Sequence, residues 1–186
     1  MEAACRVFWA KGYEGATTED LCEATGLGRS SVYNTFKSKS HLFRRSLDYY
    51  VHMMTARQIA VLGEDGPNAL ERVRGLLTVV IDGEMESRRE GYGSGCFTVN
   101  TITSLASKDP LVAKIIDTDL ERRLFSLRSV IKSGRLDGSI SSPRDAQSLA
   151  WYLVSVIYGM RVAAQSGVDR QILDDIATTS LDALTT

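Results

Sequence analysis

The side chains with the clearest potential for recognition chemistry lie together in residues 29–34, which read RSSVYN. Arginine pairs with two acceptors on a guanine edge, and serine, tyrosine and asparagine bond phosphates or bases. Val32 and Phe36 are four residues apart, which predicts a helix with its apolar side turned inward. The pattern therefore indicates a helix that presents Arg29 and its polar neighbours to a nucleic acid.

The charge around this helix favours the same partner. Between Ala24 and Leu47 there are no acidic residues, whereas the basic residues are Arg29, Lys37, Lys39, Arg44 and Arg45. The chain has 22 basic and 23 acidic residues, so the remainder carries 17 against 23. One patch of five positive charges on a nearly neutral chain predicts contact with DNA phosphates. A solvated helical hairpin is the alternative, and the missing acids disfavour it.

A second short helix is predicted just before the first, over residues 17–25. Thr17 and Thr18 are candidate N-cap residues, and the acidic side chains that follow suit the positive end of the helix dipole. Gly26 can adopt a positive φ, which ends this helix and turns the chain. The apolar side chains expected on its inner face are Leu21, Ala24 and Leu27. The two helices together form a helix-turn-helix pattern.

At this point the N-terminal segment resembles the DNA-binding domain of TetR-family transcriptional regulators. The matching positions are Phe8, Gly12, Tyr13, Thr18, Leu21, Gly26, Tyr33, Phe36, Lys39 and Leu42. Several spaced positions match together, so the resemblance is specific, although it covers only about a quarter of the chain by motif. It implies a regulator, in most cases a repressor, that binds a palindromic operator as a dimer and responds to a small-molecule effector.

The residues expected to bind double-stranded DNA come from this segment. They are Thr18, Arg29, Ser30, Ser31, Tyr33, Asn34 and Lys39. Tyr33 and Lys39 resemble the family's phosphate-contacting tyrosine and lysine, and Arg29 is the candidate for guanine reading. The sequence departs from the family's usual pattern at Gly28, Ser30, Asn34 and Ser40, which leaves the operator sequence open.

Helical periodicity extends over the whole chain and predicts an all-α fold of about nine helices. The other helices are expected over residues 2–11, 39–58, 67–89, 96–107, 109–133, 144–166 and 169–184. Residues 63–68, 91–95 and 134–143 are rich in glycine, serine or proline and predict breaks. We expect a helix-turn-helix DNA-binding domain at 1–45 and a larger helical effector-binding and dimerisation domain at 46–186.

The apolar positions of the later helices predict which faces are buried. In the fourth helix these are Leu42, Phe43, Leu47, Tyr50, Val51 and Met54. In 67–89 they are Ala69, Val73, Leu76, Leu77, Val80 and Ile81, and in 109–133 they are Leu111, Ile115, Leu120, Leu124, Leu127 and Ile131. In the last helix they are Ile172, Leu173, Ile176, Leu181 and Leu184.

The helix over 144–166 is apolar on more than one face, so it is either deeply buried or shared between subunits. Together with 169–184 it resembles the helix pair through which family members form dimers, and we expect a homodimer through 144–184. The resemblance also implies a pocket for a largely apolar effector inside the C-terminal helices. The candidate lining residues are Met85, Cys96, Phe97, Asn100, Phe125, Trp151, Tyr152 and Tyr158. For each of them core packing is the competing role.

The sequence leaves two alternatives to DNA binding. Cys96 follows a glycine-rich stretch at a predicted helix start, where a thiolate is favoured, so the chain could be a redox or electrophile sensor. A helical dimeric interaction protein is the other alternative. An enzyme is not expected, because hydrolase and phosphate-loop motifs are missing and the only histidines are His41 and His52.

Composition sets the remaining expectations. The three cysteines, Cys5, Cys22 and Cys96, are too few and too scattered for a disulfide framework or a metal site. The longest apolar run, over 149–160, is too short to span a bilayer. No leader opens the sequence, so a cytoplasmic protein without membrane contact is expected, and no cofactor or metal is predicted.

Overall fold

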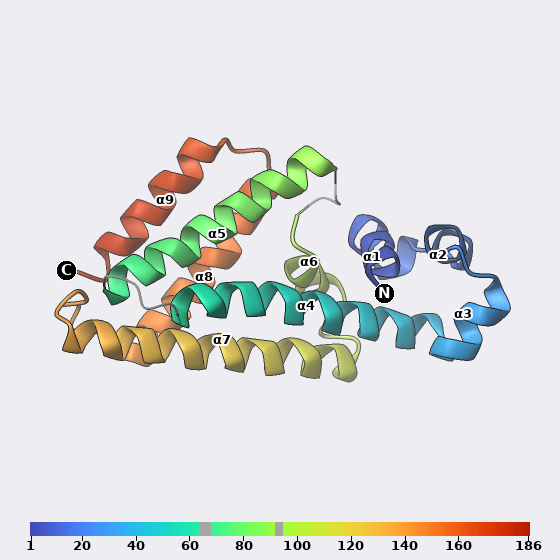
Figure 1. The fold of residues 1–186 in the computed structure, drawn as a ribbon, viewed down its shortest axis with the longest axis horizontal. Helices are drawn as coiled ribbons and strands as arrows, with labels where there is room; N and C mark the ends of the chain where they lie inside the picture. Colours follow the sequence, from blue (N-terminus) through green and yellow to red (C-terminus); the bar gives the residue numbers. More distant parts are fainter. Residues whose placement is uncertain (64–67, 92–94) are drawn as a thin grey trace. The chain divides into compact units, whose positions relative to one another are not determined.

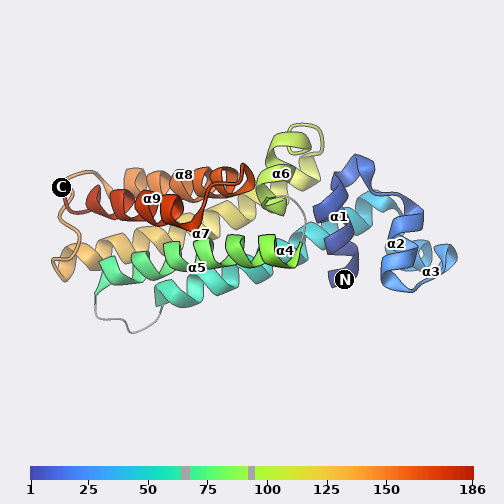
Figure 2. The ribbon, with the colours of Figure 1, turned by 90° about the horizontal axis from the view of Figure 1, so that it is seen from above.

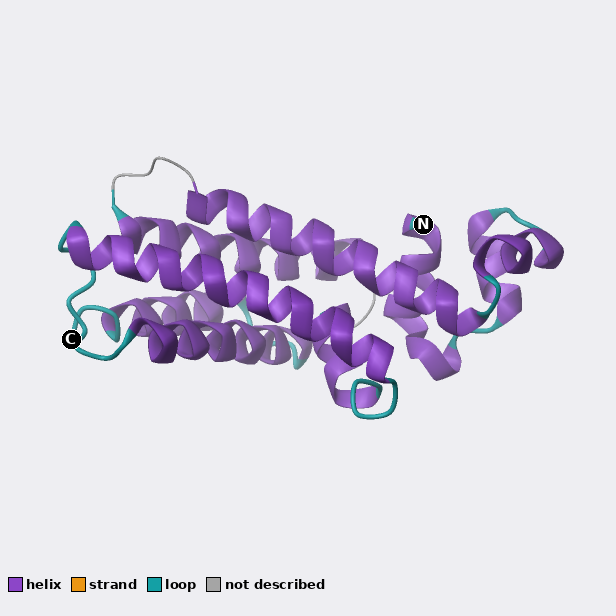
Figure 3. Cartoon of the chain, turned by 90° about the horizontal axis from the view of Figure 1, so that it is seen from below, coloured by secondary structure: helices purple, strands orange, loops and turns teal. Residues whose placement is uncertain are grey.

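The computed structural model describes residues 1–63, 68–91 and 95–186, and for Tyr33 the backbone only. The described residues form nine α-helices and no strand (Figure 1, Figure 3). The helices are α1 (Glu2–Gly15), α2 (Thr18–Thr25), α3 (Arg29–Phe36), α4 (Lys39–Gly63), α5 (Ala69–Glu90), α6 (Phe97–Ser104), α7 (Pro110–Leu136), α8 (Ala146–Gln165) and α9 (Arg170–Asp182). The predicted all-α fold is therefore confirmed.

Contacts between residues divide the chain into two compact units. The first unit comprises residues 1–54 and 87–119, and the second comprises residues 55–86 and 120–186. This grouping differs from a boundary after residue 45 because α6, although late in the sequence, packs against α1. The boundary after residue 45 stays a prediction.

Aromatic side chains hold the first unit together. Phe43 of α4 meets Phe8 and Phe97 edge to face, with ring centroids 5.1 and 5.5 Å apart. Tyr50 of α4 meets Trp9 and Phe97 in the same way, at 5.1 and 5.5 Å. Edge-to-face pairs at these distances add about 0.5–1.5 kcal/mol each beyond the burial of their area. We call these five side chains the aromatic cluster; they fix α1, α4 and α6 against one another.

The second unit has its own core of aliphatic side chains. In Figure 2, α8 and α9 lie side by side, and the contacts agree. All six apolar residues predicted on the inner face of the fifth helix are buried there: Ala69, Val73, Leu76, Leu77, Val80 and Ile81. They pack with Leu149, Leu153 and Ile157 of α8 and with Leu173 of α9 in one cluster. Helical spacing therefore predicted this core correctly.

Some side chains predicted to be buried are not. Leu111 is 55% exposed, whereas Val112 and Ile116 are buried on the inner face of α7. Leu27 and Ile172 are also exposed, and Ala24 lies at the surface of α2. Met54, Ile115, Leu120 and Ile176 are half-buried. A position at a helix end is covered only if another element reaches it, which the spacing within one helix does not reveal.

Several helix boundaries also differ from the predicted ones. Helix α4 continues to Gly63 and α7 to Leu136, whereas α6 spans only Phe97–Ser104. Helix α1 continues beyond Lys11, but Gly12 is non-helical with φ 68°, so the break predicted there exists as a kink. The predicted breaks at 63–68 and 91–95, and the start at Pro67, lie partly outside the described residues. Among the described residues, no helix has the length and apolar character needed to cross a membrane.

We expect Leu77→Ala to lower the free energy of unfolding by about 2–5 kcal/mol, because it leaves a cavity beneath a fully buried side chain. Chemical denaturation followed by circular dichroism measures this loss. Leu136→Ala, at a position of α7 that is 90% exposed, is the matched control and should change stability by less than about 0.5 kcal/mol. Equal losses for the two variants would contradict the proposed core.

Candidate DNA-binding interface

A capping box starts α2 and sets the position of the helix-turn-helix. The backbone N–H of Asp20 donates to Thr17 Oγ1 at 3.1 Å, and the N–H of Thr17 donates to Asp20 Oδ2 at 2.9 Å. Thr17 is therefore the cap, whereas Thr18 is the first helical residue. The prediction that Thr18 caps the helix is wrong, because only the hydroxyl one residue earlier reaches the N–H of Asp20.

Asp20 also ties α2 to α1. Lys11 Nζ donates to Asp20 Oδ1 at 2.6 Å. This bond to Lys11 and the hydrogen bonds with Thr17 hold the pKa of Asp20 at about 2, well below its usual value. Since the charged form is the one bound in the folded chain, Asp20 stabilises the junction only while it is ionised.

The second helix of the motif carries its polar side chains outward. Gly26 has φ 67° in the left-handed region and ends α2, as predicted. Leu21 and Val32 are buried on the inner side of α2 and α3. The predicted readers of α3 are exposed on its outer side: Arg29, Ser30, Ser31 and Asn34. The face that the sequence predicted to contact DNA is thus uncovered.

The basic residues near the motif differ in how freely they could contact a DNA phosphate. Arg29, Lys37 and Arg45 are exposed. Arg44 instead donates to Ser40 at 2.7 Å and to Asp109 at 3.2 Å, which neutralises it. The estimate of five local positive charges is therefore too high by one, because an acid distant in the sequence folds onto the patch.

Lys39 is neither fully exposed nor, among the described residues, paired with an acid. Its ammonium donates to the backbone carbonyl of Glu14 at 3.4 Å and lies 4.8 Å from the centre of the Tyr13 ring. These contacts place it beside the C-terminal end of α1, where the helix dipole favours a cation. To reach a phosphate, Lys39 must exchange two weak contacts for a charged one.

The joint between α3 and α4 contains a backbone feature that the sequence did not reveal. Lys37 has φ 61°, and among the described residues it is the only residue other than glycine with positive φ. This conformation costs a lysine roughly 1 kcal/mol relative to glycine. The turn between the reading helix and α4 therefore depends on a residue held in an unfavourable geometry.

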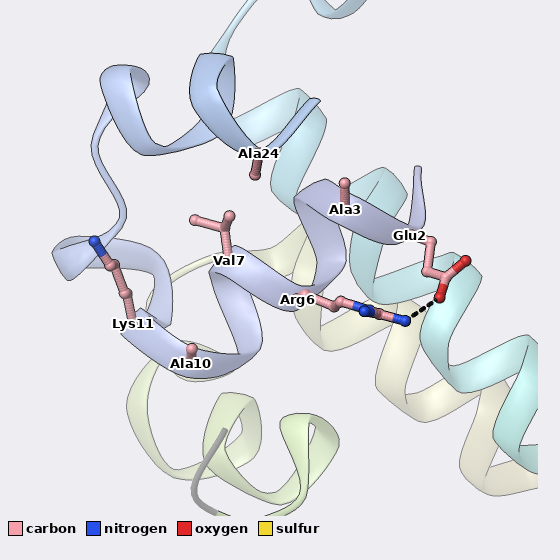
Figure 4. Close-up of a pocket in the computed structure, with 7 residues that line it drawn as sticks. All are labelled: Glu2, Ala3, Arg6, Val7, Ala10, Lys11 and Ala24. Atoms are coloured by element: carbon pink, nitrogen blue, oxygen red, sulfur yellow. Dashed lines mark hydrogen bonds and ion pairs between the residues drawn. The ribbon is translucent and has the colours of Figure 1, made fainter. Parts of the chain in front are cut away.

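A groove of about 590 Å³ runs along α1 beside α2, and Figure 4 shows its lining. Its floor consists of the small side chains Ala3, Val7, Ala10 and Ala24. The charged side chains at its edges are engaged: Arg6 donates to Glu2, and Lys11 binds Asp20. This arrangement explains why Ala24, expected inside, is exposed to solvent.

The eight candidate effector-lining residues divide between the two units. In the first unit, Cys96 is 2% exposed and its sulfur accepts a hydrogen bond from the hydroxyl of Tyr50 at 3.7 Å. Phe97 belongs to the aromatic cluster, and Asn100 is half-buried. Burial of this kind is typical of a structural cysteine rather than a reactive one.

The other five candidates lie in the second unit. Met85, Tyr152 and Tyr158 are half-buried and pack against its core. Phe125 and Trp151 are 70% and 44% exposed, so they lie at the surface rather than inside. The hydroxyl of Tyr158 accepts a hydrogen bond from Arg123 at 2.6 Å, with the guanidinium 5.1 Å from the ring centre.

Sequence reasoning missed the charged side chains inside this core. Arg123, Arg161 and Glu84 are all at least nine-tenths buried, and Arg161 forms an ion pair with Glu84 at 3.6 Å. Each of them occupies a helix position that the periodicity assigns to the core, which was the available signal. Buried charges are costly unless they have partners: Arg161 of α8 is paired with Glu84 of α5, and Arg123 of α7 bonds Tyr158 of α8.

An exposed recognition helix in a helix-turn-helix motif, joined to an independent helical unit, defines a DNA-binding transcriptional regulator. A family model for bacterial regulatory proteins of the tetR family matches residues 1–45. A second, for the tetracyclin repressor-like C-terminal domain, matches residues 69–179, which is more than half of the chain. The chain belongs to the TetR family of transcriptional regulators.

Relatives and solved structures agree with this assignment. The transcriptional repressor ComR of Escherichia coli strain K12 is 26% identical over 181 residues, covering 97% of this chain and 85% of its own. A cysteine variant of the TetR-family regulator CifR, solved with a 26-base-pair operator DNA, is 28% identical with a TM-score of 0.83, covering 97% and 93% of the chains. These relatives are regulators, and the alternative functions as an interaction protein or Cys96 sensor are not favoured.

We expect the stabilising effect of Asp20 to depend on pH. Its folded pKa of about 2 lies below the unfolded value of about 3.9, so the contribution is complete above that value and is lost as the pH falls toward 2. Asp20→Asn should therefore lower the melting temperature at pH 7, and the difference from wild type should shrink between about pH 4 and pH 2. Glu19→Gln, a neighbouring residue outside the capping box, is the control; a gap that persists unchanged at pH 2 would contradict the mechanism.

Proposed function

We propose that the chain is a repressor that binds a palindromic operator as a homodimer and releases it on binding a small-molecule effector. The observation that carries this proposal is the exposed polar face of α3, next to a stretch from Ala24 to Leu47 without any acidic residue. Phosphate contacts from such a face make affinity fall steeply with salt. Binding of operator DNA by CifR, a member of the same family, supports the same mode of action.

The predicted DNA-binding side chains of α2, α3 and α4 have two roles under this proposal. Arg29, at the start of the helix, is assigned to a guanine edge through its two-pronged guanidinium. Ser30, Ser31 and Asn34 lie on the same exposed side and contact bases or backbone. Thr18, Tyr33 and Lys39 are assigned to phosphates, where they fix the register of the helix in the major groove without reading sequence.

Dimerisation is assigned to α8 and α9. On α8, the exposed residues Trp151, Ser155 and Val162 recur at spacings of four and seven, which places them on one side of the helix. Val162 is 53% exposed and Ile172 of α9 is 45% exposed, so apolar surface remains uncovered in the single chain. A two-fold dimer would place two α3 helices in successive major grooves, about 34–36 Å apart.

The effector would act through α4. This helix of 25 residues is about 37 Å long, and its first turns belong to the DNA-binding unit whereas its last turns belong to the other unit. An effector changes operator affinity only if it binds one arrangement of the dimer better than the other. Since the buried ion pair of Arg161 and Glu84 occupies part of the second unit's core, a largely apolar effector would bind in the aliphatic part of that core.

We expect Arg29→Ala to weaken specific operator binding by about 1–3 kcal/mol, roughly 5- to 150-fold, and to relax discrimination at one base pair per half-site. The operator is first recovered by selection from a random DNA pool, and affinities are measured by fluorescence anisotropy. Arg74→Ala, an exposed arginine paired with Glu71 in the second unit, is the control and should bind like wild type. A recovered motif without two-fold symmetry, or equal affinities for both variants, would refute the proposal.

Val162→Glu should convert the dimer to monomers, because a carboxylate would then be buried without a partner at the interface. Sedimentation velocity measures the change, and operator binding should weaken with it. The matched control is Leu136→Glu, which adds the same charge to an exposed position of α7. If Val162→Glu remains dimeric while folded, the interface lies elsewhere.

A further inference from the structure

The second unit has a surface groove that the proposed function does not use. It is open to solvent, has a volume of about 310 Å³, and lies where the end of α4, the start of α5 and the middle of α7 meet. Its lining residues are Ile59, Leu62, Gly63, Arg72, Phe125, Ser126, Ser129, Val130 and Ser133. This volume is at the lower end of the range for ligand pockets, about 300–1,000 Å³, so it suits a small molecule.

One part of the groove is polar and positively charged. The guanidinium of Arg72 donates to the carbonyl of Leu62 at 3.2 Å and to Ser133 Oγ at 2.9 Å, which fixes its plane. Ser126, Ser129 and Ser133 lie on the same side of α7 and add hydroxyl groups. A guanidinium held in place beside hydroxyls is the arrangement that proteins use for carboxylate and phosphate groups.

The other part of the groove is apolar. Phe125 is 70% exposed, which is unusual for a phenylalanine at the edge of a cavity, and Ile59, Leu62 and Val130 line the space beside it. An apolar group in this position would cover the Phe125 ring and remove its apolar surface from water. The groove thus combines an anion-binding end with an apolar side.

The part of α7 that lines the groove is rich in positive charge, like Arg72 itself. Between residues 120 and 136, α7 has five basic residues and one acid, Glu121. Arg123 is buried against Tyr158, so four of the basic residues lie outside the core. The acidic neighbour of Arg72 is Asp137. Its carboxylate accepts hydrogen bonds from the backbone N–H groups of Ala69 and Ser139. Hydrogen bonds from the Ser139 side chain, the Ser139 backbone and the Ala69 backbone lower the pKa of Asp137, so its negative charge is held at the start of α5. A long positively charged stretch attracts an anion.

We propose that this groove between α4, α5 and α7 binds a small amphipathic anion, with its acidic group on Arg72 and the serines and its apolar tail against Phe125. Binding of the anion can be measured without DNA, so only its effect on operator affinity rests on the proposed function. Because Ile59, Leu62 and Gly63 belong to the helix whose other end adjoins the DNA-reading motif, the bound anion also alters operator affinity. Phe125, which the sequence placed inside an effector pocket, would thus contact a ligand in a groove at the surface of the unit.

The test compares three probes that share one apolar chain and differ in charge: octanoate, octanamide and octylamine. Isothermal titration calorimetry on the full chain should detect octanoate binding at least tenfold tighter than binding of the amide or the amine. Ser129→Leu, which fills the groove from an exposed position, and Phe125→Ala should each weaken octanoate binding at least tenfold. Leu136→Ala, on the same helix outside the groove, should leave it unchanged.

Three results would overturn the proposal. They are equal binding of the three probes, no octanoate binding by the wild type, and unchanged binding in both groove variants. Conversion of Ser129→Leu to a folded monomer would also overturn it, because the groove would then be covered by a second copy of the chain. If octanoate binds the groove but leaves operator affinity unaltered, the site stands and the coupling fails, whereas absence of operator binding alone refutes the proposed repressor function.

Discussion

Edge-to-face packing of five aromatic rings is the interaction on which the DNA-binding unit depends. Phe43 of α4 contacts Phe8 and Tyr13 of α1, and Tyr50 of α4 contacts Trp9 of α1. Both Phe43 and Tyr50 also contact Phe97 of α6. The indole N–H of Trp9 also donates to the carbonyl of Gly95 at 2.5 Å, just before α6 begins. Because these rings are large and their contacts directional, α1 and α6 have little freedom to slide along α4. A ligand signal that displaced α6 would therefore act directly on the helix that supports the recognition motif.

Most of the fold could be predicted from local sequence patterns. The spacing of Val73, Leu77 and Val80 predicted the inner face of α5, and Gly26 predicted the end of α2, because both depend on interactions within a few residues. The polar face of α3 was predictable for the same reason. The exposure of Leu111 was not, since it depends on where α7 begins relative to helices distant in the sequence.

The parts of the site that could not be predicted involve long-range partners. The local sequence predicts that Arg44 is a free phosphate-binding cation, but Asp109, 65 residues later, binds it. Of the two predicted cap residues, Thr17 caps α2 and Thr18 does not, a difference of one residue that lies within the accuracy of any helix boundary from sequence. Arg123 and Arg161 were missed because a basic residue in an apolar helix is normally assigned to the surface.

The left-handed conformation of Lys37 has a consequence for how the chain tolerates change. Residues branched at the β-carbon are strongly disfavoured at φ 61°, whereas glycine and asparagine adopt it readily. Evolutionary drift at position 37 should therefore be confined to a narrow set of residue types, even though the side chain is fully accessible to water. Such a restriction would have the appearance of selection for DNA contact while arising from backbone geometry alone.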